Sequence, residues 1–234
     1  MKTKSICLTN ENKEIELTDL DDLSLTLNDN ASLTLKLLNL HEDKNLKFAA
    51  KLGQNCSLKV VFADFSKGNI KLVSNVELLE SGANCEWHLA TLSNSNFTKE
   101  FDVSFKHLVG HTSAIMDNYG VARDHSKIVF SGCNHIVNGA KQSITRQNAK
   151  IIVFDKESIG VASPILKIDE NDVQASHGAV VGQLNSDHMF YLMSRGLSKD
   201  EARLLITRGY LAPISRHFSE ENKALIEKAI EEAM

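Results

Sequence analysis

The chain is dominated by short runs of alternating apolar and polar residues, each closed by turn residues. The clearest pair is Leu-Ser-Leu-Thr-Leu at 23–27 and Ser-Leu-Thr-Leu-Lys-Leu at 32–37, separated by Asn28-Asp29-Asn30. Because side chains on a strand point alternately to opposite faces, this pattern predicts β-strands with one buried face. Further strand-like runs between about Ile15 and Ile168 lie at 58–62, 70–73, 76–79, 87–92, 101–105, 128–130 and 151–154.

No helical pattern of any length interrupts these runs. A doubly wound α/β fold alternates strands with helices, so that class is excluded. Two mainly-β architectures remain, an antiparallel sandwich and a β-solenoid. A solenoid usually shows a repeat of fixed length, and none is visible in this sequence. The strand pattern alone therefore leaves both architectures open.

The character of the chain changes at about Asn185, where a helical pattern begins. Ser186 is expected to cap a first short helix, and Gly196 lies just past its expected end. This change predicts two parts, a β core over residues 1–184 and a C-terminal helical segment over residues 185–234.

Two more helices are expected in the C-terminal segment. Ser198 and Glu201 have the spacing of a capping box, which opens the second helix. Gly209 and then Pro213 weaken and end that helix, and a last helix starts near Ser219. Apolar stripes are expected at Ala202, Leu205 and Ile206 and at Leu225, Ile226, Ala229 and Ile230. Such stripes either pack on the chain's own core or bind a partner.

Charge and hydropathy argue against nucleic acid and membrane partners. The net charge is −4, which gives no overall attraction to phosphate backbones. No apolar run approaches the ~20 residues that span a bilayer. The N-terminal residues MKTKSICLTNENKE are partly basic but lack the apolar segment of a secretory signal. A cytoplasmic protein is therefore expected.

The Walker A, G-x-S-x-G, H-E-x-x-H and G-x-G-x-x-G motifs are missing from the sequence, so no catalytic residue is assigned. The stretch from Gly132 to Lys141 superficially resembles a phosphate-binding loop, but its spacing and its Ala140 exclude that function. A carbohydrate-active β-solenoid would need carboxylates that converge in a cleft, whereas the acidic residues here cluster in turns. Such an enzyme stays open as an alternative, as does a β-solenoid interaction protein without a metal role.

The four cysteines, Cys7, Cys56, Cys85 and Cys133, lie far apart in the sequence. Their spacing supports neither a disulfide framework nor a structural zinc site, so reduced thiols packed as small apolar side chains are expected. Cys133 and His135 are two residues apart and would share one face of a strand, where both could bind one metal. Because no third ligand is identifiable, this metal pair is a minor alternative.

One stretch, from Val173 to Tyr210, carries more specific information. It combines His177 between small residues, a short helix, the turn Ser194-Arg195-Gly196 and a second helix. Upstream, back to about Phe105, the chain carries Phe130-Ser131-Gly132, Gly139-Ala140 and the run from Arg146 to Asn148. In this order and spacing, the second half of the chain resembles the SufB/SufD family of iron–sulfur cluster assembly, with SufD the more similar.

The resemblance implies a right-handed parallel β-helix with C-terminal α-helices, in a short form without the N-terminal helical domain of longer relatives. It implies a non-enzymatic subunit of a SufBCD-type complex, in which this chain pairs with a SufB-like subunit through the end of the β-helix. A SufD-like homodimer that serves as an assembly platform is the alternative within the family. By the same resemblance, the helices dock a SufC-like ABC ATPase through Arg195, Gly196, Leu205, Gly209 and Tyr210.

His177 matches the SufD histidine that lies at the interface with SufB, near a SufB cysteine. The resemblance therefore implies a role for His177 as a metal ligand or proton relay during cluster assembly. Ala175 stands where many SufD sequences carry cysteine, and Ala149 and Gly178 stand where SufB carries cysteine and glutamate. The isolated chain is therefore expected to hold no cofactor, and any iron–sulfur cluster would be transient, at the interface of the complex.

Overall fold

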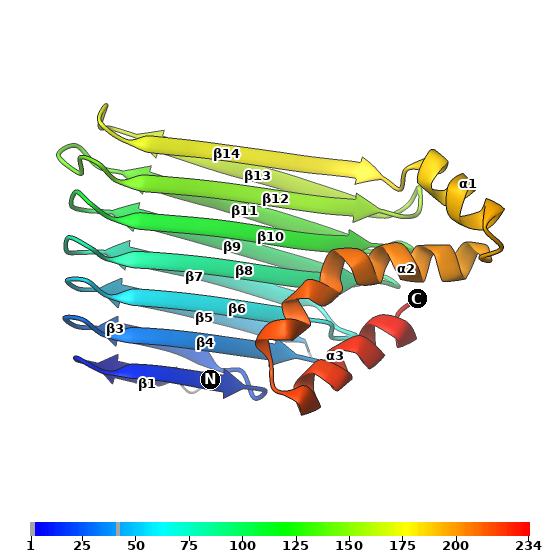
Figure 1. Ribbon diagram of the computed structural model, residues 1–234, viewed down its shortest axis with the longest axis horizontal. Coiled ribbons are helices and arrows are strands. Elements are labelled where there is room, and N and C mark those ends of the chain that lie inside the picture. Colours follow the sequence, from blue (N-terminus) through cyan, green and yellow to red (C-terminus); the bar gives the residue numbers. More distant parts are fainter. Residues whose placement is uncertain (1–2, 41–42) are drawn as a thin grey trace.

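The computed structural model of the protein describes residues 3–40 and 43–234, and within them the chain forms fourteen strands followed by helices (Figure 1). The odd-numbered strands are β1 (Thr3–Leu8), β3 (Asp22–Leu27), β5 (Lys44–Leu52), β7 (Ile70–Leu78), β9 (Thr98–His107), β11 (Lys127–Ile136) and β13 (Ile159–Ile168). The even-numbered strands are β2 (Asn12–Leu17), β4 (Ser32–Asn39), β6 (Ser57–Asp64), β8 (Asn84–Ser93), β10 (Ser113–Ala122), β12 (Ile144–Val153) and β14 (Gln174–Gln183).

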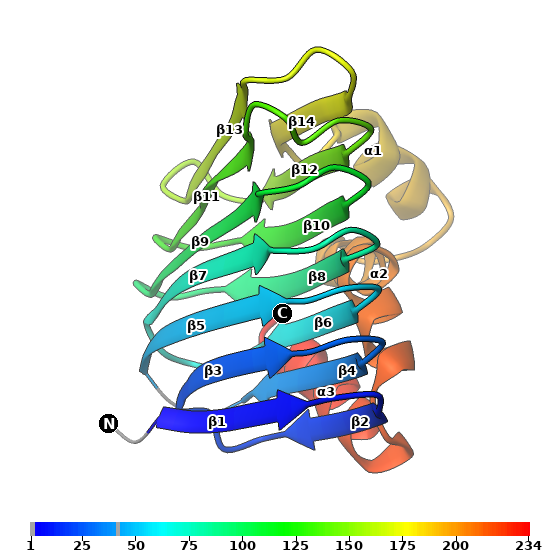
Figure 2. The ribbon, with the colours of Figure 1, turned by 90° about the vertical axis from the view of Figure 1, so that its left-hand side faces the viewer.

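These strands form two parallel sheets, one odd-numbered and one even-numbered. Each coil of the chain gives one strand to the odd sheet and the next to the even sheet, so that the coils stack as in Figure 2. The predicted β-solenoid is confirmed, and the antiparallel sandwich is excluded. The right-handed sense of the coil stays a prediction.

The coils differ in length, which explains why no fixed repeat is visible in the sequence. Asn12 of β2 lies opposite Ser32 of β4, 20 residues later, whereas Ile144 of β12 lies opposite Gln174 of β14, 30 residues later.

The strands predicted from the sequence agree only in part with the observed strands. The runs 70–73 and 76–79 belong to one strand, β7, and six strands, β1, β2, β5, β10, β13 and β14, were absent from the runs identified above.

Alternating side chains fill the space between the two sheets. Trp87 and Phe48 are buried there with their rings edge to face at a centroid distance of 5.4 Å. The interior also holds a buried ion pair. The Lys99 Nζ atom lies 2.7 Å from Asp64 Oδ2, and neither side chain is exposed.

The Asp64 carboxylate is fully engaged by hydrogen bonds. Its Oδ1 accepts from Asn39 Nδ2 at 3.0 Å and from Ser66 Oγ at 2.8 Å, and its Oδ2 also accepts from Thr91 Oγ1 at 2.9 Å. Lys99 Nζ donates in addition to the Ser66 carbonyl oxygen at 2.9 Å. The buried charges therefore have the partners that offset their loss of hydration.

The helices follow the last coil, and all but the first of them pack on the outer face of the even sheet (Figures 1 and 2). They are α1 (Ser186–Ser194), α2 (Lys199–Leu211), a 3₁₀ helix η1 (Ala212–His217) and α3 (Glu220–Glu232). Ile226 and Ile230 of α3 are fully buried in a second apolar cluster with residues of β4, β6, β8 and β10. Among the described residues, none of the helices combines the length and the apolar character that crossing a bilayer requires.

The helix ends largely follow the sequence signals. Ser198 and Glu201 form the expected capping box, and Gly196 lies just past α1 with a positive φ of 95°. The prediction that Ser186 caps α1 is wrong, because the side chain of Asn185 accepts the hydrogen bonds from the backbone N–H groups of Asp187 and His188. An amide side chain serves this role as well as a hydroxyl does.

Polar contacts fix the helices to coils that lie far apart. Glu16 of β2 accepts hydrogen bonds from the Ser219 backbone N–H at 3.1 Å, from Ser219 Oγ at 2.8 Å and from Asn222 Nδ2. Burial alone would raise the pKa of the Glu16 carboxyl, but these hydrogen bonds and the Lys36 charge lower it below its usual value. Arg203 of α2 forms an ion pair with Asp155, after β12, at 3.0 Å.

Candidate interface site at the open end of the solenoid

The last coil, formed by β13 and β14, leaves one end of the solenoid open. Each of these strands is the last in its sheet, so one side of its backbone carries no ladder partner among the described residues. The apolar interior is also uncovered here, because Val181 lies opposite the buried Ile151 in the ladder and faces inward, yet is 43% exposed. Edge strands with exposed apolar residues are typical of surfaces that bind another chain.

His177 lies on β14 at this open end and is exposed. In the ladder it pairs with Gln147 of β12, whose side chain is 3% exposed and faces the interior. Because residues opposite each other in a parallel ladder point to the same side, His177 belongs to the inward column that ends at the opening. The imidazole is therefore positioned where the solenoid interior meets the surface.

Gln147 adds a polar group directly below that opening. Its Nε2 donates a long hydrogen bond, 3.5 Å, to the Gly132 carbonyl oxygen, and its Oε1 has no partner among the described residues. A buried amide oxygen without a partner is rare and costly in a folded protein. No sequence pattern indicates this residue, because a single glutamine in a strand is usually a surface residue.

The Cys133–His135 pair lies elsewhere, on the outer face of the odd sheet. Both side chains share that face, as expected from their spacing, but His135 Nε2 is 2.7 Å from Asp169 Oδ2. The hydrogen bond from His135 lowers the pKa of the Asp169 carboxyl. Within residues 3–40 and 43–234, no three His, Cys, Asp or Glu side chains are grouped closely enough to hold a metal ion.

The other cysteines divide into two kinds. Cys56 and Cys85 are buried, as expected for small apolar side chains, and burial raises the pKa of the Cys85 thiol. The expectation is wrong for Cys7, which is exposed on β1. Cys7 pairs with Thr26 of β3, between the buried Leu25 and Leu27, so its side chain points to the outer face of the odd sheet.

Helix α1 follows directly after β14 (Figure 1). None of its residues is buried, and Phe190, Tyr191 and Met193 are exposed. Arg195 lies over the Tyr191 ring at 5.2 Å. The sequence offered a signal for this surface, because five consecutive apolar residues at 189–193 cannot all lie on one face of a helix.

The residues predicted to dock an ATPase separate into two groups. Arg195, Gly196 and Leu205 are exposed, with Leu205 50% exposed although the predicted stripe grouped it with the buried Ala202. Tyr210 instead faces the chain's own even sheet, where its ring meets Tyr119 edge to face at 5.3 Å. Gly209 is exposed next to it.

Fold and site define a class of protein, a two-sheet parallel β-solenoid with an open apolar end and a helical segment packed on one sheet. The family described as "SUF system FeS cluster assembly, SufBD core domain" matches residues 10–210. The chain therefore belongs to the SufBD core family, as the sequence resemblance predicted.

Individual relatives agree with this assignment. The chain is 29% identical over 170 residues to the iron-sulfur cluster assembly protein SufD of Bacillus subtilis, which covers 73% of this chain and 39% of the relative. It is 31% identical over 125 residues to an iron-sulfur cluster assembly SufBD family protein of Mycobacterium leprae, covering 53% of this chain and 14% of the relative. A SufBD family protein of Staphylococcus epidermidis is 22% identical over 191 residues, covering 81% and 38%. The chain thus spans about two fifths or less of these relatives.

Proposed function

We propose that this protein is a SufD-like, non-enzymatic subunit that pairs with a SufB-like chain through the open end formed by β13 and β14. The observation that carries the proposal is the coincidence of His177, unpaired edge strands and exposed apolar residues at one end of the solenoid. A partner strand at this end would supply ladder hydrogen bonds and cover the apolar side chains. The cytoplasmic setting predicted from the sequence is part of this proposal.

In this complex, an iron–sulfur cluster is cargo that forms at the interface. This chain has no cysteine after Cys133, so the thiolates would come from the SufB-like partner. His177 would supply an imidazole nitrogen as a ligand or move a proton as the cluster forms. The amide oxygen of Gln147 lies in the same inward column and suits an imidazole N–H as an acceptor.

Co-expression with SufB-like and SufC-like proteins, followed by purification through this chain, tests the proposal. A stable complex with both partners would support it. A homodimer in which β14 pairs with itself would favour the platform alternative, because the same open end can bind a second copy. If this chain stays monomeric and captures neither partner, the proposal is wrong.

Replacing His177 with alanine should leave the fold and partner binding intact, because the side chain is exposed and its loss opens no cavity. We expect a change in unfolding free energy within about 0.5 kcal/mol. The iron and sulfide content of the co-expressed complex should fall roughly tenfold or more, as expected when a metal site loses a ligand or its support. Elemental analysis and thermal unfolding measure the two effects.

His125→Ala is the matched control for this experiment. His125 is also exposed, but it lies in the turn between β10 and β11, away from the open end. Its replacement should leave the cluster yield unchanged. A wild-type cluster yield from His177→Ala would remove the assigned role, whatever the melting temperature.

We also propose that α1 and the exposed side of α2 dock the SufC-like ATPase. Leu205→Glu should weaken that binding by roughly 30-fold or more, the effect of losing an interface hot spot. The variant should fold, because Leu205 lies outside both buried apolar clusters. Calorimetric titration with the purified ATPase measures the change.

Leu225→Glu provides a control of the same chemistry. Leu225 is 42% exposed on α3, in a surface region formed with Leu40 and Phe65 rather than α1. It should bind the ATPase as the wild type does. Normal binding by a folded Leu205→Glu protein would exclude this docking surface, and equal loss in both variants would shift the surface toward α3.

A further inference from the structure

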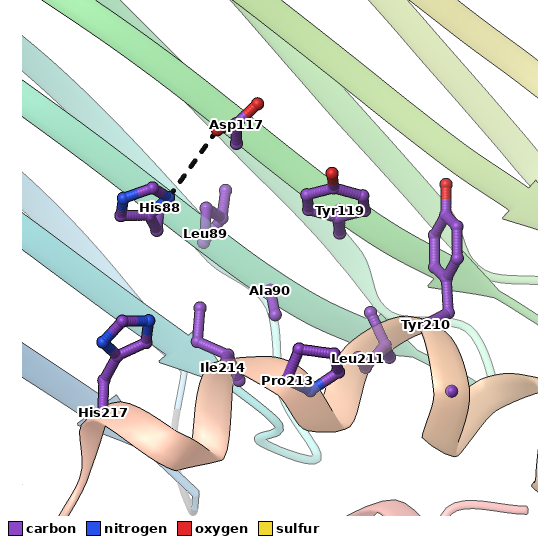
Figure 3. A pocket seen from close by; sticks show the side chains of 11 residues that line it. His88, Leu89, Ala90, Asp117, Tyr119, Tyr210, Leu211, Pro213, Ile214 and His217 are labelled. Carbon is purple, nitrogen blue, oxygen red and sulfur yellow. Dashed lines mark ion pairs between the residues drawn. The ribbon is translucent and has the colours of Figure 1, made fainter.

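A pocket lies between the even sheet and the joint of α2 with η1, away from the open end (Figure 3). Its volume is about 310 Å³, which is within the size of sites that hold small organic molecules. Leu211, Pro213 and Ile214 form its helical wall, and Ala90 of β8 lies on the opposite side. The pocket thus has apolar walls contributed by both layers of the fold.

The polar groups of the pocket are rich in hydrogen-bond acceptors. Asp117 Oδ1 accepts from Asn148 Nδ2 at 3.0 Å, whereas among the described residues its Oδ2 has one polar neighbour, His88 Nδ1, at 3.8 Å. The hydroxyls of Tyr119 and Tyr210 carry no hydrogen bond to the described residues, and Figure 3 shows both pointing the same way. Burial, with Tyr119 nearby, raises the pKa of Tyr210 to about 12, so its phenol stays protonated.

Two histidines complete the end of the pocket near Asp117. The rings of His88 and His217 are stacked at a centroid distance of 6.0 Å and an interplanar angle of 11°. In this arrangement their nitrogen lone pairs lie in the ring planes and do not converge on a point between the rings, which excludes one shared metal ion there. Burial, together with the Lys59 charge, lowers the pKa of His217 below its usual value.

The aromatic side of the pocket already holds a cation. Lys150 Nζ lies 5.6 Å from the centroid of the Tyr119 ring. A positive charge near a tyrosine face is stabilised by the ring quadrupole. The site therefore favours a positively charged donor at the Asp117 carboxylate oxygen rather than at the Tyr119 face where Lys150 lies, and the two phenol oxygens and the Tyr210 ring complete its lining.

We propose that this pocket binds an organic cation, an amidinium, guanidinium or ammonium group attached to a flat apolar body. The charged group would donate hydrogen bonds to Asp117 Oδ2, and the body would lie against Tyr119, Tyr210 and the apolar wall of η1. The proposal is independent of cluster assembly, because the pocket shares no residue with the open end. The ligand would thus bind between the even sheet and the segment where α2 meets η1.

Benzamidine is the probe, and benzamide is its neutral control of nearly the same shape. With ¹³C-labelled tyrosine, saturable shifts of the Tyr119 and Tyr210 ring signals are expected with a Kd of about 1 mM, the affinity of a fragment-sized ligand. Tyr191, the third tyrosine, lies on α1 and should not respond. Benzamide should bind at least tenfold more weakly.

Asp117→Asn should weaken benzamidine binding at least tenfold while preserving the melting temperature. Asp102→Asn, an exposed position on β9 of the opposite sheet, is the control and should bind normally.

A short peptide, acetyl-Gly-Arg-Gly-amide, distinguishes the source of the cation. Tighter binding of the peptide would indicate a protein side chain, and tighter binding of benzamidine a free small molecule. No saturable shift with either probe up to about 20 mM, or equal binding by Asp117→Asn, would overturn the proposal.

Discussion

Replacing Lys99 with methionine is expected to lower the free energy of unfolding by about 3 to 5 kcal/mol, the usual cost of leaving a buried charge without its partner. Methionine keeps the apolar part of the side chain but removes the ammonium group. The Asp64 carboxylate would stay buried with its three neutral donors, Asn39, Ser66 and Thr91, and without a positive charge. In the wild type, burial lowers the pKa of the Lys99 ammonium and the adjacent Asp64 opposes that shift. Urea denaturation followed by circular dichroism measures the loss.

Two controls separate the buried charge from the loss of a lysine. Lys106→Met lies on the same strand with its side chain exposed and should change stability by no more than about 0.5 kcal/mol. The double variant Lys99→Met with Asp64→Asn removes both charges and should recover part of the loss. If Lys99→Met costs less than about 1 kcal/mol, Asp64 is not held as a buried anion.

Gly132→Ala is expected to destabilise the protein by about 4 kcal/mol or more, or to prevent folding, because it creates a backbone collision. Gly132 has a φ of 148°, and an added Cβ would lie 1.8 Å from the Val103 carbonyl oxygen and 2.7 Å from its carbon. Backbone atoms of the neighbouring strand β9 cannot move aside without opening the β9–β11 ladder. Thermal and urea unfolding measure the effect.

Gly139→Ala is the matched control for this prediction. Gly139 also has a positive φ, 88°, but an added Cβ would have no atom within 4 Å. The substitution therefore carries only the backbone strain of an L-residue in this region, about 1 kcal/mol. Equal losses at the two positions would show that φ strain, rather than the approach to Val103, determines the need for glycine at 132.

The alternation of apolar and polar residues predicted many of the strands in the β core, but not where most of these strands begin and end. Alternation located β3, β4 and β6 because each has one fully buried face. Strand β14 lacks this contrast, because no further coil covers it and nearly all its residues are exposed. The repeat was hidden because successive coils lengthen, so that paired residues lie at no constant spacing.

The site was predictable only where it resembled known sequences. His177 was selected by resemblance, since an exposed histidine between small residues has no distinctive periodicity. The predicted apolar stripe placed Leu205 with Ala202 on one face of the helix. In the structure Ala202 is buried and Leu205 is half exposed, because the sheet covers only the side of α2 that carries Ala202. The Asp117–Tyr210 pocket joins residues from different layers, and no local pattern encodes such a meeting.

The contact of Glu16 with Ser219 and Asn222 changes how this solenoid should unfold. A solenoid without other contacts is held by nearest neighbours, so its end coils can fray independently. Here the helical segment connects distant coils. It is hydrogen-bonded to Glu16 of β2, packs on β4, β6, β8 and β10, and forms an ion pair with Asp155 after β12. Fraying at the β1 end must therefore also break the start of α3. Hydrogen exchange should consequently report similar opening free energies for β2 and α3, although more than 200 residues separate them.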